Sequence, residues 1–166
     1  MTEKEFAEIM KKYSEPLYWQ IRRMVNNHED ANDLLQNTFM KAWTNADSFR
    51  NDSKISTWLY RIATNETLDF LRKQKRSGDE ISMDEVASIA NRLNADKYFD
   101  GDEIQTKLQT AITTLPPTQR TVFNMRYFDD MKYSDMSKIL GTSEGALKAS
   151  YHLAVQKISN FFSKHD

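Results

Sequence analysis

One stretch in the last third of the chain decides the fold: YSDMSKILGTSEGALKASYHLAVQKI, Tyr133–Ile158. Its first eight residues place apolar side chains at helical spacing, and Gly141 then suits a left-handed turn that a residue with a Cβ resists. Ser143 is placed to cap a second helix, and Glu144 favours the positive end of that helix. The predicted apolar residues of the first helix are Tyr133, Met136, Ile139 and Leu140.

The second helix of this stretch is predicted to have two different faces. At 100° per residue, its apolar face and its outward face separate cleanly. Helix, short glycine turn and helix form a helix-turn-helix, whose second helix can enter a DNA major groove. An ordinary helical hairpin that packs a core is the alternative, and a lone surface His152 suits either reading. The apolar face holds Leu147, Tyr151, Ala154 and Ile158, and the outward face holds Gly145, Lys148, Ala149, His152 and Gln156.

Helical periodicity also dominates the rest of the chain, and no convincing alternating strand appears. We therefore expect an all-α protein. Pro16 either breaks the first helical segment or begins its second half. Thr118 is expected to cap the helix that follows Pro116 and Pro117. The expected helices span 4–26, 30–43, 55–75, 106–115, 118–127, 133–140 and 143–162.

The net charge of −1 hides a strong pattern along the chain. Residues 61–76 carry five cations against two acids, residues 77–103 carry eight acids against two cations, and residues 132–164 carry five lysines against two acids. Phosphate contacts depend on local charge, so two basic blocks are compatible with nucleic-acid binding. We expect two small helical domains, 1–76 and 103–166, joined by a flexible acidic linker, 77–102, with a short helix near 83–93.

Two helices of the first domain carry candidate contact faces. On residues 30–43, a polar face with an exposed methionine is either plain solvent surface or a docking face. On residues 55–75, Trp58, Tyr60 and Arg61 combine aromatic rings with charge, and a basic run follows. That combination suits single-stranded DNA, since cations meet the backbone and rings stack on bases. Trp58 fits a core position equally well.

Enzyme chemistry has little support in the sequence. There is no cysteine, the three histidines lie far apart, and no HExxH motif or glycine-rich phosphate loop is present. We expect a non-enzymatic protein without metal or cofactor. No stretch approaches the roughly 18 apolar residues of a membrane span, so no direct membrane insertion and a cytoplasmic location are expected.

Three segments in order resemble the extracytoplasmic-function (ECF) sigma factors of the sigma-70 family. They are DANDLLQNTFMKAW (Asp30–Trp43), STWLYRIATNETLDFLRKQKR (Ser56–Arg76) and LPPTQRTVFNMRYFDDMKYSDMSKILGTSEGALKASYHLAVQKI (Leu115–Ile158). The resemblance implies a transcription initiation factor that binds bacterial core RNA polymerase and directs it to promoters. It also implies control by an anti-sigma factor. A helix-turn-helix regulator that acts without stable polymerase binding is the alternative function.

The resemblance also implies roles for individual residues. The face toward the polymerase would comprise Asp30, Asp33, Gln36, Asn37 and Met40. Melted DNA of the minus-ten promoter element would meet Arg50, Asn51, Asp52, Ser53, Lys54, Thr57, Trp58, Arg61, Asn65, Arg72 and Lys73. Duplex DNA of the minus-thirty-five element would meet Arg120, Ser143, Glu144, Gly145, Lys148 and His152. Typical members carry basic residues near Leu153 and Val155, where this chain is apolar.

Overall fold

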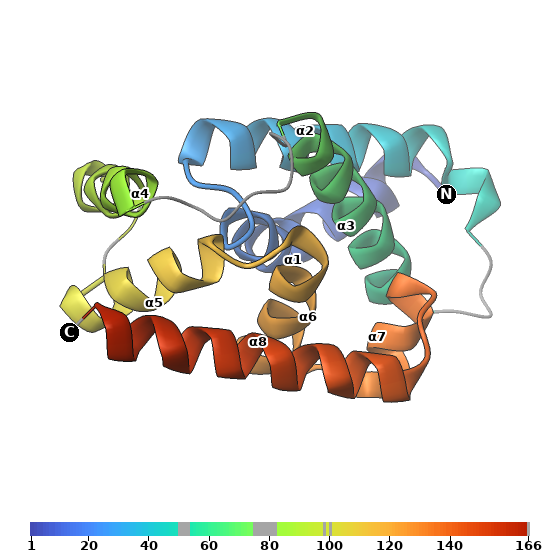
Figure 1. The fold of residues 1–166 in the computed structure, drawn as a ribbon. Coiled ribbons are helices and arrows are strands. Elements are labelled where there is room, and N and C mark those ends of the chain that lie inside the picture. The colour runs from blue at the N-terminus through green and yellow to red at the C-terminus, as the bar shows by residue number, and fades with distance from the viewer. Residues whose placement is uncertain (50–53, 75–82, 98, 100, 166) are drawn as a thin grey trace.

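The computed structural model describes residues 1–166 except 50–53, 75–82, 98, 100 and 166. Within these residues the chain forms helices and no strand, which confirms the predicted all-α fold (Figure 1). The α-helices are α1 (Glu3–Arg22), α2 (His28–Thr44), α3 (Ile55–Gln74), α4 (Met83–Ala95), α5 (Glu103–Thr113), α6 (Pro117–Tyr127), α7 (Tyr133–Leu140) and α8 (Glu144–Lys164), and a short 3₁₀ helix spans Ala46–Ser48.

Helices α1, α2 and α3 share one apolar core. Leu17, Ile21 and Leu59 are fully buried at its centre. Pro16 lies inside α1, which continues through it as one helix. The turn that follows Pro16 contributes Leu17 and Ile21 to the core, and this packing stabilises the helix across the missing backbone donor. Pro16 therefore neither ends a helix nor begins one.

Helices α5 to α8 form the second domain, and its helix-turn-helix follows the sequence closely. Gly141 ends α7 with φ 65°, in the left-handed region. The Ser143 hydroxyl accepts a hydrogen bond from the Ala146 amide at 3.2 Å and so caps α8. The cap predicted for Thr118 is wrong, because α6 already begins at Pro117 and Pro116 is its N-cap. Proline suits the first helical position, where no amide donor is needed.

The described part of the linker contains helix α4, which matches the short helix expected near 83–93. In α4, Ile89 and Leu93 are buried, and the helix packs against α5. Asp96, just after α4, forms an ion pair with the buried Arg22 at the end of α1. The acidic linker is thus fastened to both domains at this point, and its two acids at 79 and 80 lie outside the described residues.

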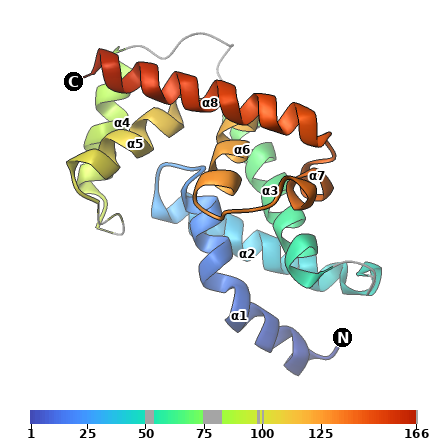
Figure 2. The same ribbon diagram turned by 90° about the horizontal axis from the view of Figure 1, so that it is seen from below.

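The two domains also contact each other directly. Helix α3 lies against α6 and α7, and both views show α7 beside one end of α3 (Figures 1 and 2). We call this contact, together with the contact of the α1–α2 turn with α5 and α6, the seam. The long helix α8 runs along the side of the second domain that faces away from α2 (Figure 1).

Candidate nucleic-acid and protein interfaces

The outward face of α8 is free of core contacts. Gly145, Lys148 and His152 are exposed, whereas Leu147 and Ala154 are buried on the opposite side. The separation of the two faces is the one expected from the helical period. Ser143 and Glu144, at the start of the helix, are exposed as well. A cationic side chain and an imidazole therefore stand near a helix N-terminus, in reach of a DNA groove or its phosphates.

Two apolar side chains interrupt the polar surface of α8 further along. Leu153 is 47% exposed and Val155 is 37% exposed. Apolar side chains at these two positions offer no contact to phosphate.

Helix α3 divides the predicted minus-ten residues between core and surface. Thr57 and Trp58 are only 8% and 9% exposed, and the Trp58 ring lies 5.1 Å from the Phe49 ring. Trp58 therefore occupies a core position in this structure. Asn65 and Lys73 are exposed.

The remaining minus-ten candidates are Lys54, Arg61, Arg72 and residues 50–53. Lys54 is exposed just before α3, and Arg72 is exposed and paired with Asp69. Arg61 is exposed but already donates a hydrogen bond across the seam to the Lys138 carbonyl at 2.9 Å. Arg50, Asn51, Asp52 and Ser53 lie outside the described residues.

The outward face of α2 has the composition predicted for it. Asp33, Gln36, Asn37 and Met40 are exposed, and Met40 is 66% exposed despite its apolar side chain. Asp30 is already engaged in a hydrogen bond at the start of the helix, where the Asn27 side-chain amide donates to its carboxylate at 2.8 Å. The face therefore combines one acid, two amides and an unusually exposed methionine.

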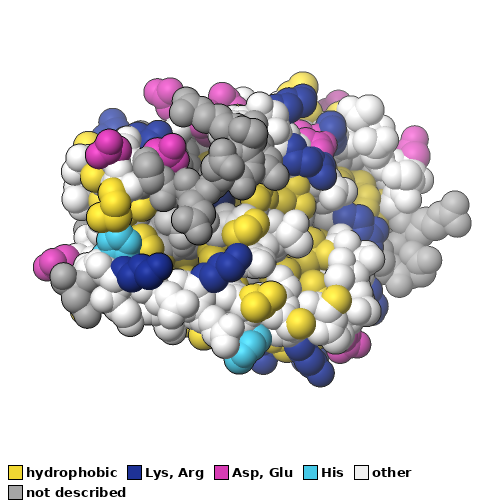
Figure 3. Space-filling view, viewed as in Figure 1, with side chains coloured by type: hydrophobic (Ala, Val, Ile, Leu, Met, Phe, Trp, Pro, Cys, Tyr) yellow, Lys and Arg dark blue, Asp and Glu magenta, His cyan; other side chains and the backbone are white. Residues whose placement is uncertain are grey.

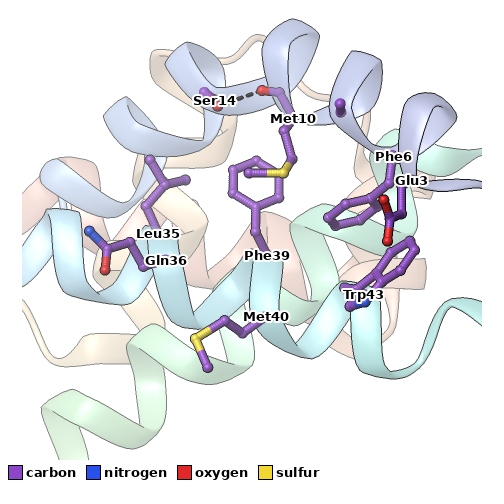
Figure 4. A pocket seen from close by; sticks show the side chains of 10 residues that line it. Glu3, Phe6, Met10, Ser14, Leu35, Gln36, Phe39, Met40 and Trp43 are labelled. Atoms are coloured by element: carbon purple, nitrogen blue, oxygen red, sulfur yellow. Dashed lines mark hydrogen bonds between the residues drawn. The ribbon is translucent and has the colours of Figure 1, made fainter.

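A groove of about 640 Å³ runs beside this face, between α1 and α2 (Figure 4). Sequence reasoning did not find it, although Phe6 and Met10 are four residues apart and Met40 and Trp43 three, the spacings that align side chains on a helix. Figure 4 shows Met10 and Phe39 approaching each other across its floor. The groove is lined by Glu3, Phe6, Ala7, Met10, Ser14, Leu35, Gln36, Phe39, Met40 and Trp43.

Arg120 does not join the other candidate DNA residues. Its side chain is 8% exposed and lies in the seam. It donates hydrogen bonds to the carbonyls of Met24 at 2.6 Å, Thr113 at 2.9 Å and Leu115 at 3.1 Å. In this arrangement Arg120 binds backbone of both domains and leaves no donor at the surface toward DNA. A basic residue on a helix gives no local signal of such burial, because the acceptor in the first domain, the Met24 carbonyl, lies 96 residues earlier in the chain.

Burial changes the electrostatics of Arg120. It lowers the pKa of the guanidinium from 12.5 to about 10. A shift of that size corresponds to about 3 kcal/mol of desolvation. Three hydrogen bonds from a charged donor, at about 1.5–3 kcal/mol each, offset this cost. The Nε atom of Arg120 is buried without a hydrogen-bond partner, so the guanidinium is satisfied only through its two terminal nitrogens.

Arg23 is a second cation of the seam that sequence reasoning missed. It forms an ion pair with Asp129 at 3.1 Å, and its guanidinium stands 4.4 Å from the centre of the Phe128 ring. The Arg23 carbonyl accepts a bond from the Gln109 amide at 3.0 Å. Desolvation raises the pKa of the Asp129 carboxyl, while Arg23 acts in the opposite direction.

The charged side chains of the described residues are dispersed on the face seen in Figure 3. Lys and Arg side chains are scattered there among hydrophobic ones. Among the described residues, no group of His, Asp and Glu could hold a metal ion. None of the helices in the described ranges is long and apolar enough to cross a bilayer.

The comparisons with known proteins match both domains of the chain. The Sigma-70 region 2 family matches residues 9–77, and the Sigma-70, region 4 family matches residues 105–158. The ECF RNA polymerase sigma factor SigW of Bacillus subtilis is 34% identical over 155 residues, covering 89% of this chain and 83% of SigW. Sigma factor SigV of the same organism is 30% identical over 142 residues, covering 86% of this chain and 81% of SigV.

Solved structures show the same fold across both domains. The sigma factor RpoE of Bartonella quintana, in complex with the anti-sigma factor NepR, gives a TM-score of 0.72 at 21% identity and covers 98% of this chain and 99% of its own. CnrH, in complex with the cytosolic domain of CnrY, gives 0.73 at 19% identity and covers 99% and 92%. The chain therefore belongs to the ECF sigma factors of the sigma-70 family, and it directs RNA polymerase to specific promoters.

Proposed function

We propose that three helices divide the work of promoter recognition. Helix α8 reads duplex minus-thirty-five DNA, α3 with the residues before it binds melted minus-ten DNA, and α2 docks on core RNA polymerase. The corresponding units are residues 1–76 and 103–166, with 77–102 as the connection. The observation that carries the proposal is the exposed outward face of α8, opposite a buried apolar face on a capped helix.

The minus-ten assignment rests on the exposed residues of α3. Arg72 and Lys73 lie in the last turn, and Asn65 lies two turns earlier. Exposed cations bind the backbone of a single strand, and an amide can read a base edge. Trp58 supports this surface from inside through its contact with Phe49.

The polymerase assignment rests on the α2 face and the adjoining groove. Gln36 and Met40 belong to both. A mostly apolar hollow next to exposed polar residues has the anatomy of a protein interface, with an apolar centre and a polar rim. An exposed methionine adds a flexible contact that adapts to a partner surface.

The chain acts stoichiometrically, without catalysis, metal or cofactor, and works in the cytoplasm where its polymerase is. It is held in check by an anti-sigma factor, as the solved relatives RpoE and CnrH are bound by NepR and CnrY. The basis for these statements is family membership together with the faces described above.

Run-off transcription tests the proposal directly. Core polymerase is incubated with a genomic fragment library, with and without the chain. We expect a discrete set of transcripts that requires the chain, and co-purification of the chain with core polymerase. Duplex binding without polymerase association would instead favour a plain helix-turn-helix regulator. Chelator treatment, followed by restoration of the polymerase's own Mg²⁺, should leave the transcripts unchanged.

A further inference from the structure

Leu153 is a large apolar side chain that the fold of the second domain leaves in solvent. It is 47% exposed, although leucine is among the residues that proteins most often bury. It belongs to neither of the two apolar clusters around which the described residues of this domain pack. Packing of the domain core therefore does not account for a leucine at this position.

The helical period places Leu153 among the residues that face away from the core. It follows Ala149 by four residues and so lies about 40° from it around the axis, at about 100° per residue. Ala149 and His152 are exposed on this side, opposite the buried Leu147. Gly145 and Ala149, which precede Leu153 in its row, have short side chains, so Leu153 projects further from the axis than they do. A helix that lies in a major groove on this face presents Leu153 to the base edges, about 12 Å further along the helix than Gly145.

The base edges of the major groove offer a leucine one apolar feature, the 5-methyl group of thymine. The other groups there are hydrogen-bond donors and acceptors, and a leucine side chain satisfies none of them. Leucine against the amino group of cytosine would strip water from that group and leave it unpaired, which is unfavourable. Contact with a thymine methyl instead removes apolar surface of both partners from water. The chemistry of Leu153 therefore favours thymine over cytosine at the position it meets.

We propose that Leu153 reads the 5-methyl group of one thymine in the minus-thirty-five element and thereby sets the base preference at that position. The proposal rests on the proposed function of α8 and adds an apolar contact to it. Lys148 and His152, exposed on the same helix, supply polar contacts to phosphate or to base edges. The Lys148 contact weakens as the salt concentration rises, whereas the methyl contact carries no charge and does not.

A selection experiment locates the thymine. A duplex library randomised over the upstream element is bound by the full chain with core polymerase, and the bound sequences are determined for the parent and for Leu153→Ala. We expect the parent to prefer thymine at one position where Leu153→Ala accepts cytosine as well, while the preferences at other positions are retained. Because Leu153 is exposed, circular dichroism should not change.

Removal of the methyl group alone then tests the contact. Deoxyuridine replaces each thymine of the selected duplex in turn, which deletes the methyl group and keeps the hydrogen-bonding groups of the base. We expect the parent to lose affinity about fourfold at one thymine, the factor that corresponds to returning one CH₂-sized group to water. Leu153→Ala should bind the thymine and deoxyuridine duplexes equally. At the same position, 5-methylcytosine should bind the parent better than cytosine does.

Two other variants of α8 serve as controls. Val155 is also apolar and 37% exposed, but it lies about 160° from Leu153 around the helix axis. Val155→Ala should therefore keep the loss at the same thymine. Lys148→Ala should weaken binding of the thymine and deoxyuridine duplexes by the same factor, because a phosphate contact does not sense the methyl group.

The outcomes separate the leucine contact from the function of the helix. A parent chain that distinguishes no thymine from deoxyuridine overturns the proposal, and so does a Leu153→Ala variant that distinguishes them as the parent does. Loss of the distinction in Val155→Ala also overturns it. In each of these cases the selected duplex still binds, and the duplex-binding role of α8 is unaffected. If no upstream sequence is enriched and Lys148→Ala leaves duplex affinity unchanged, the proposed function of α8 itself fails.

Discussion

Lys148 is an exposed cationic side chain on the outward face of α8. Its ammonium lies 5.7 Å from the centre of the Tyr133 ring and is otherwise directed to the exposed face. Lys157 is exposed on the same helix, nine residues on and therefore half a turn around the axis. The two lysines differ in position on the helix and share their chemistry, so they form a matched pair.

We expect Lys148→Ala to weaken binding to the upstream promoter duplex and to lower the salt slope of binding by roughly one unit, because one phosphate contact releases about one counterion. Lys157→Ala should leave the slope unchanged. The measurement is a titration of duplex DNA with the polymerase-bound factor at several salt concentrations. An unchanged slope with lost sequence preference would assign Lys148 to a base edge instead of a phosphate.

Two glycines of the helix-turn-helix offer a second residue-scale test. Gly141 has φ 65°, and a Cβ placed there would meet nothing within 4 Å, so its replacement strains only the backbone. Gly141→Ala should lower the free energy of unfolding by about 1 kcal/mol. Gly145, within α8, also has open space around it, and Gly145→Ala should stabilise by up to about 1 kcal/mol. Urea denaturation of both variants checks the opposite signs, and equal effects would contradict the left-handed turn.

At the scale of elements, local signals decided how well the sequence predicted the structure. Helix α7 spans the predicted residues, because Gly141 and Ser143 mark its end and the start of α8 through bonds within a few residues. The faces of α2 and α8 followed from the helical period for the same reason. The start of α6 was misjudged because Thr118 and Pro117 both suit a helix N-terminus, and proline at the first position took precedence.

The α2 face carries a prediction of its own. Asp33, Gln36 and Met40 all point away from the core, so replacing the three together with lysine should weaken binding to core polymerase at least tenfold while circular dichroism stays unchanged. Glu8 and Glu15 on α1 are also exposed, and a variant with lysine at both serves as the charge-matched control. Unfolding of the triple variant would indicate that these residues are needed for the fold. Unchanged affinity for core polymerase would indicate that the docking face lies elsewhere.

At the scale of the whole molecule, the seam could not be predicted, because its contacts join residues about 80 to 100 positions apart. Arg61 lies 77 residues before its acceptor, and Arg120 lies 96 residues after Met24. A local stretch of sequence predicts that a basic residue on a helix is exposed, yet Arg120 is buried. Tyr60 is partly buried and packs against the apolar clusters of both domains. The ordered helix α4 was foreseen as a short element, while its packing on α5 depends on Ile89 and Leu93 meeting a surface from another part of the chain.

Melting is the step that needs the whole molecule, since a polymerase-bound factor must hold duplex at one element and single strand at the other. Unstacking costs a few kcal/mol per step, and a protein that opens DNA has to return part of it through new contacts. With core polymerase and the full chain, we expect non-template single-stranded minus-ten DNA to bind better than the same sequence as a duplex.

Arg72→Ala should weaken the binding of all DNA sequences about equally, because an exposed cation near the end of α3 meets the backbone. Lys54→Ala, at the start of α3, should alter the base preferred at one position. Competition with oligonucleotides varied one base at a time separates these effects, and a duplex that competes as well as the single strand would remove melting from the role of α3.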